Sequence, residues 1–272
     1  MFATFSTGYA AIYAALSGIS AGRCLDASAM NRLYTDLAPW FHDITHPDDY
    51  RAEAEHIGRL IDAAIDGEAR TLMELGAGGG NNALHLKRRF ACTLTDLSPA
   101  MLDLSQSINP ECAHVVGDMR ALRLGETFDV VLAHDALDYM LTVDDLHAAI
   151  ATAAIHCRPG GVAVFIPDVT AETFAPGTTH GGTDRPDGGG ARFLEWTHPL
   201  GPGETVARVD YALILKTPGK ATEIASDTHR IGVFPQEVWL DGFARAGLTV
   251  LDIDADDPHT DEHVVFVTRR DG

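Results

Sequence analysis

The stretch from Thr71 to Asp96 constrains the fold of this chain more than any other. Its first residues, Thr71–Leu75, form an apolar run that is typical of a buried parallel strand. Four glycines follow between residues 76 and 80, and a helical run comes after them. Glycines at a strand-to-helix turn let the backbone approach a ligand that a Cβ atom would hold off. A second strand, Ala91–Thr95, ends on Asp96, so the stretch is predicted to be a nucleoside-binding βαβ unit.

Two acidic residues indicate which nucleoside this unit binds. Asp96 lies roughly 20 residues beyond the first strand, where a carboxylate is placed to bind the two hydroxyls of a ribose. The glycines alone leave the choice open, because Gly78 to Ala83 also satisfies the dinucleotide pattern G-x-G-x-x-A. Glu74 argues against a dinucleotide, since a carboxylate at the end of the first strand repels a pyrophosphate and suits a cation. A ligand with a ribose, a positive charge and no phosphate is favoured.

The order of these residues resembles the first motif of the class I S-adenosylmethionine-dependent methyltransferases, an acidic residue followed by G-x-G-x-G. Here the motif reads Glu74-Leu75-Gly76-Ala77-Gly78-Gly79-Gly80. The resemblance implies S-adenosyl-L-methionine as the cofactor. It also implies an α/β fold, a Rossmann-like sheet of seven strands whose last strand runs antiparallel. The residues that it places at the cofactor are Glu74, Gly76, Gly78, Gly80, Asp96, Leu97, Asp118, Met119 and His134.

A turn after the predicted third strand, Cys112–Val116, resembles a further motif of these methyltransferases. The turn reads Gly117-Asp118-Met119. By this resemblance the Asp118 carboxylate accepts a hydrogen bond from the adenine amine, and Met119 packs on the ring. The motif is short, but its position after the glycine loop and Asp96 supports the interpretation.

The end of the predicted fourth strand, Phe128–Ala133, supplies candidates for the chemistry. In a doubly wound sheet the ends of the first and fourth strands border the ligand crevice, so His134 and Asp135 would face cofactor and substrate. Each also has a plainer role, a backbone hydrogen bond for His134 and a turn cap for Asp135. Methyl transfer depends mainly on alignment, and a base is needed only when the nucleophile arrives protonated. The candidates for a base are His134, Asp135, Tyr139 and His229, although His229 could also be a solvated strand residue.

Residues 169–230 interrupt the alternation of strands and helices. A glycine-rich loop, Gly177–Gly190, precedes three alternating or β-branched runs, which are Arg192–Trp196, Val206–Lys216 and Thr222–Gly232. We predict a three-stranded antiparallel cap, inserted after the fifth strand and lying over the substrate site. The S-adenosylmethionine-binding domain then comprises residues 30–168 and 231–272.

The cap makes the layout similar to bacterial N-methyltransferases that act on nucleotide-linked amino sugars. Their S-D-x-H run is matched by Ser226-Asp227-Thr228-His229, and their A-G-L turn by Ala246-Gly247-Leu248. Those enzymes have a tyrosine-rich run before the first strand. Here His42-Asp43-Ile44-Thr45-His46 stands in its place, so the sugar and the amine stay open. The resemblance also makes the region of Tyr34 and Trp40 a lid over the cofactor, although such an aromatic cluster is more often core.

Composition and charge exclude several classes of partner. A net charge of −19, from 20 Lys+Arg and 39 Asp+Glu, repels phosphate backbones and anionic membranes, so we expect neither nucleic acid nor a membrane as partner. The four cysteines form no C-x-x-C pair and suit a reducing cytoplasm, which is the expected location. No metal site is expected, because Pro258 prevents a helix that would align His259 and His263. Residues 1–29 are interpreted as an appended segment outside the core.

Three functions remain open at this point. The first is methyl transfer from S-adenosylmethionine to a small-molecule acceptor, with the amine of a nucleotide-linked amino sugar as one candidate. The second is an NAD(P)-dependent oxidoreductase, and the third is a catalytically silent S-adenosylmethionine-binding protein. The sequence names neither the acceptor atom nor the number of methyl groups transferred. It also leaves the oligomeric state open, a homodimer included.

Overall fold

The computed structural model describes residues 30–254 and 264–272. The helices and strands named below all lie within residues 31–272, which form one compact unit. The predicted appended segment, residues 1–29, and the pair His259 and His263 lie outside the described residues. Among the described residues, no helix is long and apolar enough to cross a bilayer, and no group of three or more His, Cys, Asp or Glu side chains is arranged to hold a metal ion.

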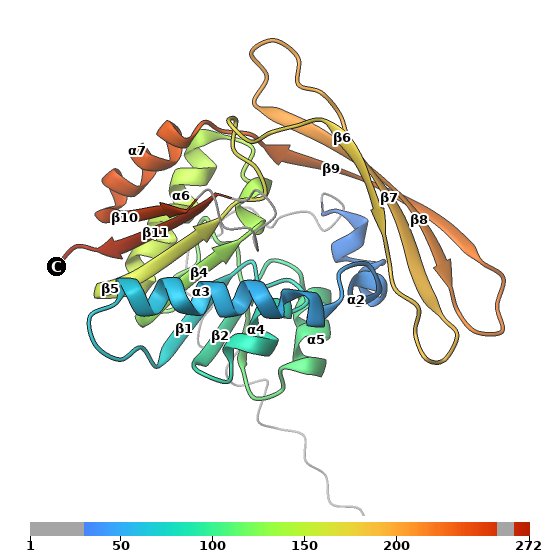
Figure 1. Ribbon diagram of the computed structural model, residues 1–272, viewed down its shortest axis with the longest axis horizontal. Helices are drawn as coiled ribbons and strands as arrows, with labels where there is room; N and C mark the ends of the chain where they lie inside the picture. The colour runs from blue at the N-terminus through green and yellow to red at the C-terminus, as the bar shows by residue number, and fades with distance from the viewer. Residues whose placement is uncertain (1–29, 255–263) are drawn as a thin grey trace, which may run out of the picture. The chain divides into compact units, whose positions relative to one another are not determined.

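A sheet of seven strands forms the centre of the methyltransferase-like part (Figure 1). Its order is β10-β11-β5-β4-β1-β2-β3, and β11 pairs antiparallel with both of its neighbours. The prediction of a Rossmann-like sheet with an antiparallel last strand is confirmed. From β1 the following strands are added on one side (β2, β3) and then, starting with β4, on the other. The carboxyl ends of the adjacent strands β1 and β4 therefore border a crevice. The strands are β1 (Thr71–Leu75), β2 (Ala91–Asp96), β3 (Ala113–Val116), β4 (Phe128–His134), β5 (Cys157–Ile166), β10 (Leu248–Asp254) and β11 (Val265–Arg270).

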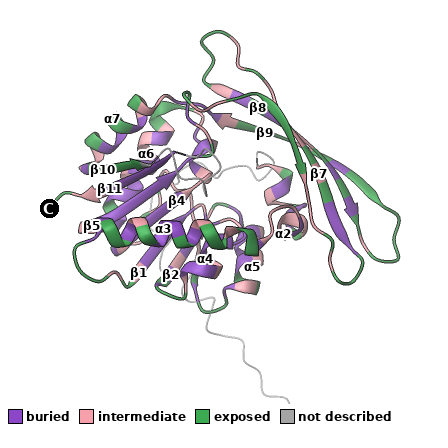
Figure 2. Ribbon diagram, viewed as in Figure 1, coloured by how far each residue is buried: buried purple, intermediate pink, exposed green. Residues whose placement is uncertain are grey.

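Helices cover both faces of this sheet because consecutive strand residues point to opposite sides. Leu72 of β1 belongs to a buried cluster that includes Ile57 and Ile61 of α3. Met73 belongs to a second cluster, which includes Leu146 of α6 and Phe243 of α7. Figure 2 shows the strands between these layers as buried and the outer sides of the helices as exposed. The helices are α3 (Arg51–Ala64), α4 (Asn81–Leu86), α5 (Pro99–Ile108), α6 (Val143–His156) and α7 (Gln236–Ala246).

A separate antiparallel sheet follows β5, with the order β6-β7-β8-β9. The sequence predicted three strands here, and that number is wrong, because β6 (Gly177–Gly181) lies within the stretch expected to be a loop. No alternation of apolar and polar side chains indicates this strand. Backbone pairing with β7 forms it, from Gly177 opposite Thr197 to Gly181 opposite Phe193. The other strands are β7 (Gly190–Thr197), β8 (Val206–Lys216) and β9 (Glu223–Gly232).

Short helical turns between residues 31 and 50 connect the two sheets (Figure 1). Leu37 packs with Leu213 and Leu215 of β8, and Trp40 packs against the same cluster. The guanidinium of Arg185 lies 5.0 Å from the centre of the Trp40 ring. Two roles were open for Trp40, a place in the core and a place in a lid over the cofactor. The structure shows it packed in the core. These turns are η2 (Arg32–Tyr34), η3 (Ala38–Trp40), α2 (Phe41–Ile44) and η4 (Pro47–Tyr50), and η5 (Ala136–Tyr139) follows β4.

Candidate active site

The glycine loop after β1 lies close to two other segments. A Cβ on Gly76, whose φ is 71°, would stand only 2.2 Å from the Ala136 side chain and 2.9 Å from the terminal carbon of Met119. A side chain at this position would collide, so the loop backbone lies directly against these residues. A Cβ on Gly80 would instead meet Ser105 Oγ at 2.2 Å. That side of Gly80 is filled by α5, which assigns Gly80 to packing in addition to its predicted place at the cofactor.

Glu74 ends β1 as a buried carboxyl group without a full set of partners. Its side chain is 3% exposed, and Oε2 has no hydrogen-bond partner among the described residues. Burial raises the pKa of Glu74 to about 8, although the nearby charge of His134 lowers it; the charges of Glu53 and Asp96 act in the same direction as burial. A buried oxygen without a donor points to a group that comes from outside the chain. A ligand ammonium fits this position, as S-adenosylmethionine would supply.

Asp96 fixes the glycine loop from the end of β2. Its Oδ2 accepts from the Gly78 N–H at 2.9 Å, and its Oδ1 accepts from the Ser98 N–H at 2.8 Å. Burial raises the pKa of Asp96, which these backbone bonds only partly offset. Each carboxylate oxygen keeps a further lone pair for a ribose hydroxyl. The neighbouring Leu97 is 37% exposed, so its side chain is open to contact with a ligand.

Asp118 is occupied by an ion pair that the sequence reasoning did not foresee. The Arg120 guanidinium donates Nε and Nη2 to its carboxylate, the latter at 2.6 Å to Oδ2. Burial alone raises the pKa of Asp118, but the Arg120 bonds outweigh it and lower the pKa below its ordinary value. Arg120 is held in turn by Asp145 at 3.2 Å. The predicted bond to an adenine amine therefore competes with this pair, whereas Met119 beside Gly76 is half-buried against the core and keeps an exposed part that a ring could contact.

His134, at the end of β4, lies between two carboxylates. Its Nε2 contacts Glu53, and its Nδ1 lies 3.0 Å from Asp135 Oδ2. Burial lowers the pKa of His134, but the charges of Asp135 and Glu53 outweigh burial and raise it well above the ordinary value. His134 is therefore an imidazolium with both N–H groups engaged, and it has no lone pair to take a proton. This arrangement does not suit the predicted role of a base. It suits a fixed charge that positions Glu53 and Asp135.

Asp135 has an unusual backbone. Its φ is 49°, a region that no other non-glycine residue occupies in the described part of the chain. Such strain costs about 1–3 kcal/mol and persists where the surroundings impose it, commonly at functional sites. Here the Asp135 N–H donates to Ile166 O of β5 at 2.7 Å, and the carboxylate faces His134. The strained turn therefore holds the side chain at the crevice, where the sequence predicted it.

His229, the candidate from the second sheet, is buried and not solvated. It is 1% exposed. Its Nδ1 lies 2.8 Å from the Tyr139 hydroxyl, and its Nε2 lies 2.9 Å from Asp227 Oδ2. The Tyr139 hydroxyl lies 2.6 Å from that of Tyr34. A continuous chain of hydrogen bonds, which we call the tyrosine relay, thus runs through Tyr34, Tyr139, His229 and Asp227.

Asp227, at the inner end of the tyrosine relay, determines which group donates in each of its hydrogen bonds. Asp227 also accepts from the Leu33 N–H at 2.8 Å, and as a carboxylate it only accepts, so His229 carries its proton on Nε2. Burial lowers the pKa of His229, which leaves the ring neutral with a free lone pair on Nδ1. Tyr139 therefore donates to His229, and Tyr34 donates to Tyr139. A proton that arrives at the Tyr34 oxygen can be passed inward to His229.

Asp135 and two further carboxyl groups, Asp138 and Asp168, form what we call the acidic floor, and the sequence reasoning found only the first. Asp138 is 2% exposed, and its Oδ2 accepts from the Asp168 N–H at 2.9 Å. Asp168 is exposed to solvent, while protein atoms crowd its carboxyl group. Burial and the charge of Asp135 raise its pKa well above the ordinary range. All three residues follow the ends of β4 or β5, which is the signal that would have found them.

The second sheet faces the acidic floor with another polar row. Glu195, Tyr211 and Asp227 stand at one register across β7, β8 and β9. The Tyr211 ring lies 4.7 Å from that of His229, centre to centre. Burial raises the pKa of Tyr211, and so do the charges of Glu195 and Asp168. Both sheets therefore contribute to one polar, strongly acidic region.

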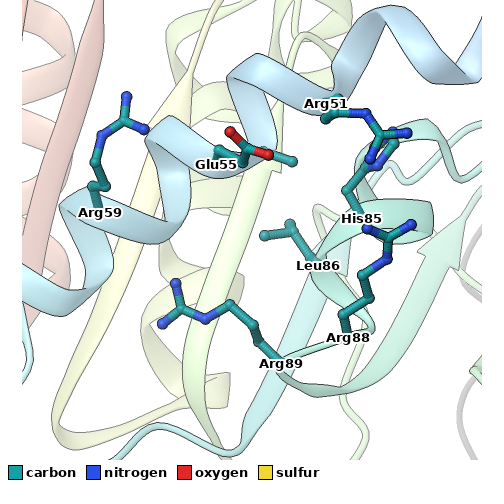
Figure 3. A pocket seen from close by; sticks show the side chains of 8 residues that line it. Arg51, Glu55, Arg59, His85, Leu86, Arg88 and Arg89 are labelled. Carbon is teal, nitrogen blue, oxygen red and sulfur yellow. The ribbon is translucent and has the colours of Figure 1, made fainter.

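A surface cavity of about 360 Å³ lies elsewhere, between α3 and the residues at the end of α4. Figure 3 shows the side chains of Arg51 and Arg88 approaching His85 there. Arg51 lies 3.5 Å from Asp48, and Arg89 lies 2.5 Å from Asp62, so part of this charge is compensated. None of the predicted site residues lines this cavity. It is separate from the crevice at the strand ends.

The switch-point loop, the unsatisfied carboxyl group of Glu74 and the antiparallel last strand define a class I S-adenosylmethionine-dependent methyltransferase. Residues 72–161 match the family described as "Methyltransferase domain". A dTDP-3-amino-3,4,6-trideoxy-alpha-D-glucopyranose N,N-dimethyltransferase of Streptomyces venezuelae is 33% identical over 204 residues, covering 74% of this chain and 84% of the relative. A dTDP-3-amino-3,6-dideoxy-alpha-D-glucopyranose N,N-dimethyltransferase of Streptomyces fradiae is 28% identical over 214 residues, covering 77% and 82%.

Solved structures agree with these relatives. The crystal structure of Streptomyces venezuelae DesVI has a TM-score of 0.74 and 28% identity, and it covers 91% of this chain and 100% of its own. The S-adenosylmethionine-bound amino pentose methyltransferase of Micromonospora echinaspora, involved in calicheamicin biosynthesis, has a TM-score of 0.68 and 26% identity, with coverages of 81% and 91%. The chain belongs to this family of S-adenosylmethionine-dependent methyltransferases. It is a methyl-transferring enzyme, and neither alternative function finds support among these proteins.

Proposed function

We propose that the enzyme methylates the amine of a sugar, and that this sugar is nucleotide-linked, like those named for its relatives. The observation that carries the proposal is the tyrosine relay. It begins at Tyr34, a half-buried phenol whose pKa is raised by burial and also by the charges of Asp168 and Asp96, and it ends at Asp227, which accepts from the Leu33 N–H. A sugar amine is mostly protonated at neutral pH, and it must lose a proton before its nitrogen can attack. A hydrogen-bonded path inward from the crevice provides for that loss.

The tyrosine relay would remove one proton without a charged phenolate. The amine gives a proton to the Tyr34 oxygen, Tyr34 passes its own to Tyr139, and Tyr139 passes its own to His229 Nδ1. The imidazolium that results is stabilised by Asp227, 2.9 Å from Nε2. The second sheet thereby contributes two residues to the chemistry. Asp135 and His134 then keep a positioning role, and His229 acts through the phenols without touching the acceptor.

The cofactor would be held by the first sheet. When bound, S-adenosylmethionine supplies a methyl group on a sulfonium, so alignment of the nucleophile contributes most of the rate. Glu74 would take the ammonium, and Asp96 the ribose hydroxyls. Gly76 and Gly78 let the backbone close on the ligand, while Met119 and Leu97 would flank the adenine.

The experiment that tests this function measures methyl transfer directly. The purified enzyme is incubated with S-adenosylmethionine and with pairs of dTDP-sugars that differ only in an amine or a hydroxyl at one carbon. We expect the amino sugars alone to gain mass, first one methyl group and then a second, because the relatives are named N,N-dimethyltransferases. Transfer to the hydroxyl sugars with none to the amines would overturn the proposal.

Further expectations belong to the same proposal. Cys92, Cys112 and Cys157 are free and buried, which suits a reducing cytoplasm. Residues 169–230 would act as the cap over the acceptor, and residues 30–168 with 231–272 as the cofactor domain. The net charge of −19 argues against nucleic acid as a partner. A homodimer stays an option that sedimentation would test.

A further inference from the structure

The surface cavity between α3 and the end of α4 gathers basic side chains on a strongly acidic protein. Its volume of about 360 Å³ is near the small end of the range for ligand pockets, about 300–1,000 Å³. Glu55 is the one carboxylate among its lining residues, and it is exposed. Such a cavity attracts a small anion, although the chain as a whole has 20 Lys+Arg against 39 Asp+Glu. The arginines that line it are Arg51, Arg59, Arg88 and Arg89.

The carboxylates around the cavity leave these arginines available. Arg88 forms no ion pair within the described part of the chain. Arg51 lies 3.5 Å from Asp48, and Arg89 lies 2.5 Å from Asp62. These two carboxylates are 64% and 61% exposed, so solvent screens both pairs and each contributes little. An anion that enters the cavity therefore displaces only weak interactions.

Two contacts fix Arg89 against α3. A Cβ on Gly58, in the middle of this helix, would stand 2.5 Å from Arg89 Nη1. The guanidinium therefore lies directly against the bare helix backbone, and its Nη2 donates to Asp62 one turn further on. A glycine inside a helix is unfavourable relative to alanine, and this close approach gives it a packing role. One wall of the cavity is thus in place before any ligand binds.

His85 supplies a second, independent observation that points to a ligand. Its side chain lines the cavity and is 8% exposed, and its Nδ1 has no hydrogen-bond partner among the described residues. Its Nε2 lies 2.9 Å from Pro47 O, a carbonyl that only accepts, so Nε2 carries the ring proton. Nδ1 of the neutral ring is then a buried acceptor without a donor. Figure 3 shows Arg51 and Arg88 approaching this same ring.

The ligand must therefore combine two opposite functions. Guanidinium groups only donate, so the ligand needs anionic oxygens for Arg51 and Arg88, whereas Nδ1 of His85 needs a donor. Hydrogenphosphate, HPO₄²⁻, has both, because three of its oxygens share the charge and the fourth carries a hydrogen. Sulfate has the same shape and charge but no hydrogen. A phosphate monoester has also lost its last hydrogen at about pH 8.

We propose that this cavity binds inorganic phosphate as hydrogenphosphate. Arg51 and Arg88 donate to its charged oxygens, and His85 Nδ1 accepts its hydrogen. Arg59 and Arg89 add positive charge around the anion. The site is separate from the crevice, and it goes beyond the proposed methyl transfer.

Bound phosphate would link two helices that also meet at the crevice. Glu53 of α3 contacts His134, and it accepts from Asn82 Nδ2 of α4 at 3.2 Å. Arg51 and His85 extend from the same two helices to the phosphate. A ligand that binds only the folded chain stabilises it, so the melting temperature should rise more with phosphate than with equal sulfate.

Isothermal titration calorimetry tests the assignment on the full chain at about pH 8, where inorganic phosphate is mainly HPO₄²⁻. Sodium phosphate, sodium sulfate and methyl phosphate are titrated separately at one ionic strength. We expect inorganic phosphate to bind about 3- to 10-fold more tightly than either of the other dianions, the range for one hydrogen bond. Equal affinities for all three, or no detectable binding of phosphate, would overturn the proposal.

Variants assign the binding to the cavity. His85→Gln retains a side-chain donor for the Pro47 carbonyl but removes the Nδ1 acceptor, so it should bind phosphate no more tightly than sulfate. Arg88→Gln should weaken both anions by about threefold or more, because a charge-assisted hydrogen bond is lost. The control is Arg245→Gln, a 70% exposed residue of α7, which packs on the opposite face of the main sheet. Both affinities should stay unchanged in this control.

Each variant should bind S-adenosylmethionine like the natural protein, which verifies that it is folded. If His85→Gln keeps the preference for phosphate, or if Arg88→Gln binds phosphate normally, the anion lies elsewhere in the protein and the proposal is wrong.

Discussion

At the scale of single residues, burial decides which groups of the site carry charge. Glu74, Asp138 and Asp168 have raised pKa values because protein and like charges surround them. His134 is the exception, since two adjacent carboxylates outweigh the effect of burial. The three carboxyl groups would ionise more readily when a cationic ligand arrives, whereas His134 keeps its charge. Burial of these carboxyl groups therefore lowers the free energy of unfolding of the ligand-free enzyme. Binding of a cationic ligand should recover part of this loss.

Glu74 gives a direct measure of this destabilisation. Its pKa in the folded protein is about 8, against an ordinary value of 4.5. The unfolded chain therefore ionises first as pH rises, and the stability of the ligand-free protein falls between these two values. We expect Glu74→Gln to escape this loss and to melt roughly 3 °C or more above the natural protein at about pH 8. Calorimetric melting across pH measures the effect.

The same variant should bind S-adenosylmethionine about tenfold or more weakly, because the ammonium loses its charged acceptor. Glu68→Gln is the control, since the Glu68 side chain is 70% exposed and its pairing with Arg70 contributes little. A Glu74→Gln protein that melts lower at pH 8, or binds the cofactor normally, would show that the carboxyl oxygen has another partner.

The tyrosine relay predicts a characteristic pH dependence. His229→Asn and Tyr34→Phe should each lower kcat by about 10²-fold or more at neutral pH. At about pH 9.5 a sugar amine is largely neutral and no longer needs the relay, so kcat of both variants should partly recover. In the natural enzyme the pKa of His229 is lowered, and the relay should stay open below the ordinary His value of 6.5. Steady-state rates against pH measure this.

His198→Asn is a matched control for the relay. His198 lies 2.8 Å from Asp210 and forms a second histidine–aspartate pair of the same sheet, away from Tyr34 and Tyr139. This variant should keep its rate at every pH. If His229→Asn is equally impaired at neutral and alkaline pH, then His229 only positions the phenols and takes no proton.

At the scale of elements, one carboxylate ties three strands together at their amino ends. Asp129 of β4 accepts from the Thr71 N–H of β1 at 3.0 Å and from Arg158 Nε of β5 at 2.6 Å. Burial raises the pKa of Asp129, but these bonds outweigh it and lower the pKa to about 2. The opposite ends of β1 and β4 carry Glu74 and His134. Asp129 thus helps to fix the register of these strands at their amino ends. This register in turn sets where Glu74 and His134 lie at the opposite, carboxyl ends.

Asp129→Asn should therefore cost about 1–3 kcal/mol of the free energy of unfolding at neutral pH. The folded pKa lies below the ordinary 3.8, so the contribution is present above that value and is lost as pH falls toward 2. Denaturant unfolding at several pH values measures the difference, which should shrink on acidification. Asp66→Asn is the control, because that side chain is 87% exposed and contributes little through Arg269. A pH-independent loss would mean that packing, and not charge, is responsible.

At the scale of the whole molecule, residues 31–272 hold the two sheets and the turns between them. The turns with Leu33 and Tyr34 join the second sheet to the first, because Leu33 binds Asp227 of β9 and Tyr34 binds Tyr139 of η5. The proposed acceptor site is therefore made by three separate parts of the chain. Its integrity depends on how these parts pack.

A chain that starts at Met30 tests the predicted role of residues 1–29 as an appended segment. We expect it to fold, to bind S-adenosylmethionine with unchanged affinity and to melt within about 2 °C of the full chain. The buried clusters on both faces of the main sheet are formed within residues 31–272. A drop of more than about 4 °C would correspond to a loss near 1 kcal/mol and would contradict the interpretation. Differential scanning calorimetry of both proteins gives the answer.

The sequence by itself was enough to predict the cofactor side of this enzyme. The glycine loop, Glu74 and Asp96 follow one another within a single βαβ unit, where local pattern and backbone geometry suffice to predict a strand, a turn and a helix. The antiparallel last strand followed from the resemblance, and the pairing of β11 with β5 confirms it. The glycine loop, Glu74 and Asp96 depend on interactions between residues close together in the chain. Such local features can be predicted from the sequence alone.

Only the tertiary structure decided the acceptor side. His134 looked like a base until packing placed Glu53 beside it, and the alternative that His229 is a solvated strand residue fails because the ring is 1% exposed. Strand β6 exists because β7 pairs with it, not because its own residues favour a strand. The protonation state of a group depends on the charges and burial around it, and these come from segments far apart in the chain. Local sequence patterns therefore predict the elements, whereas their packing determines which side chains carry a proton.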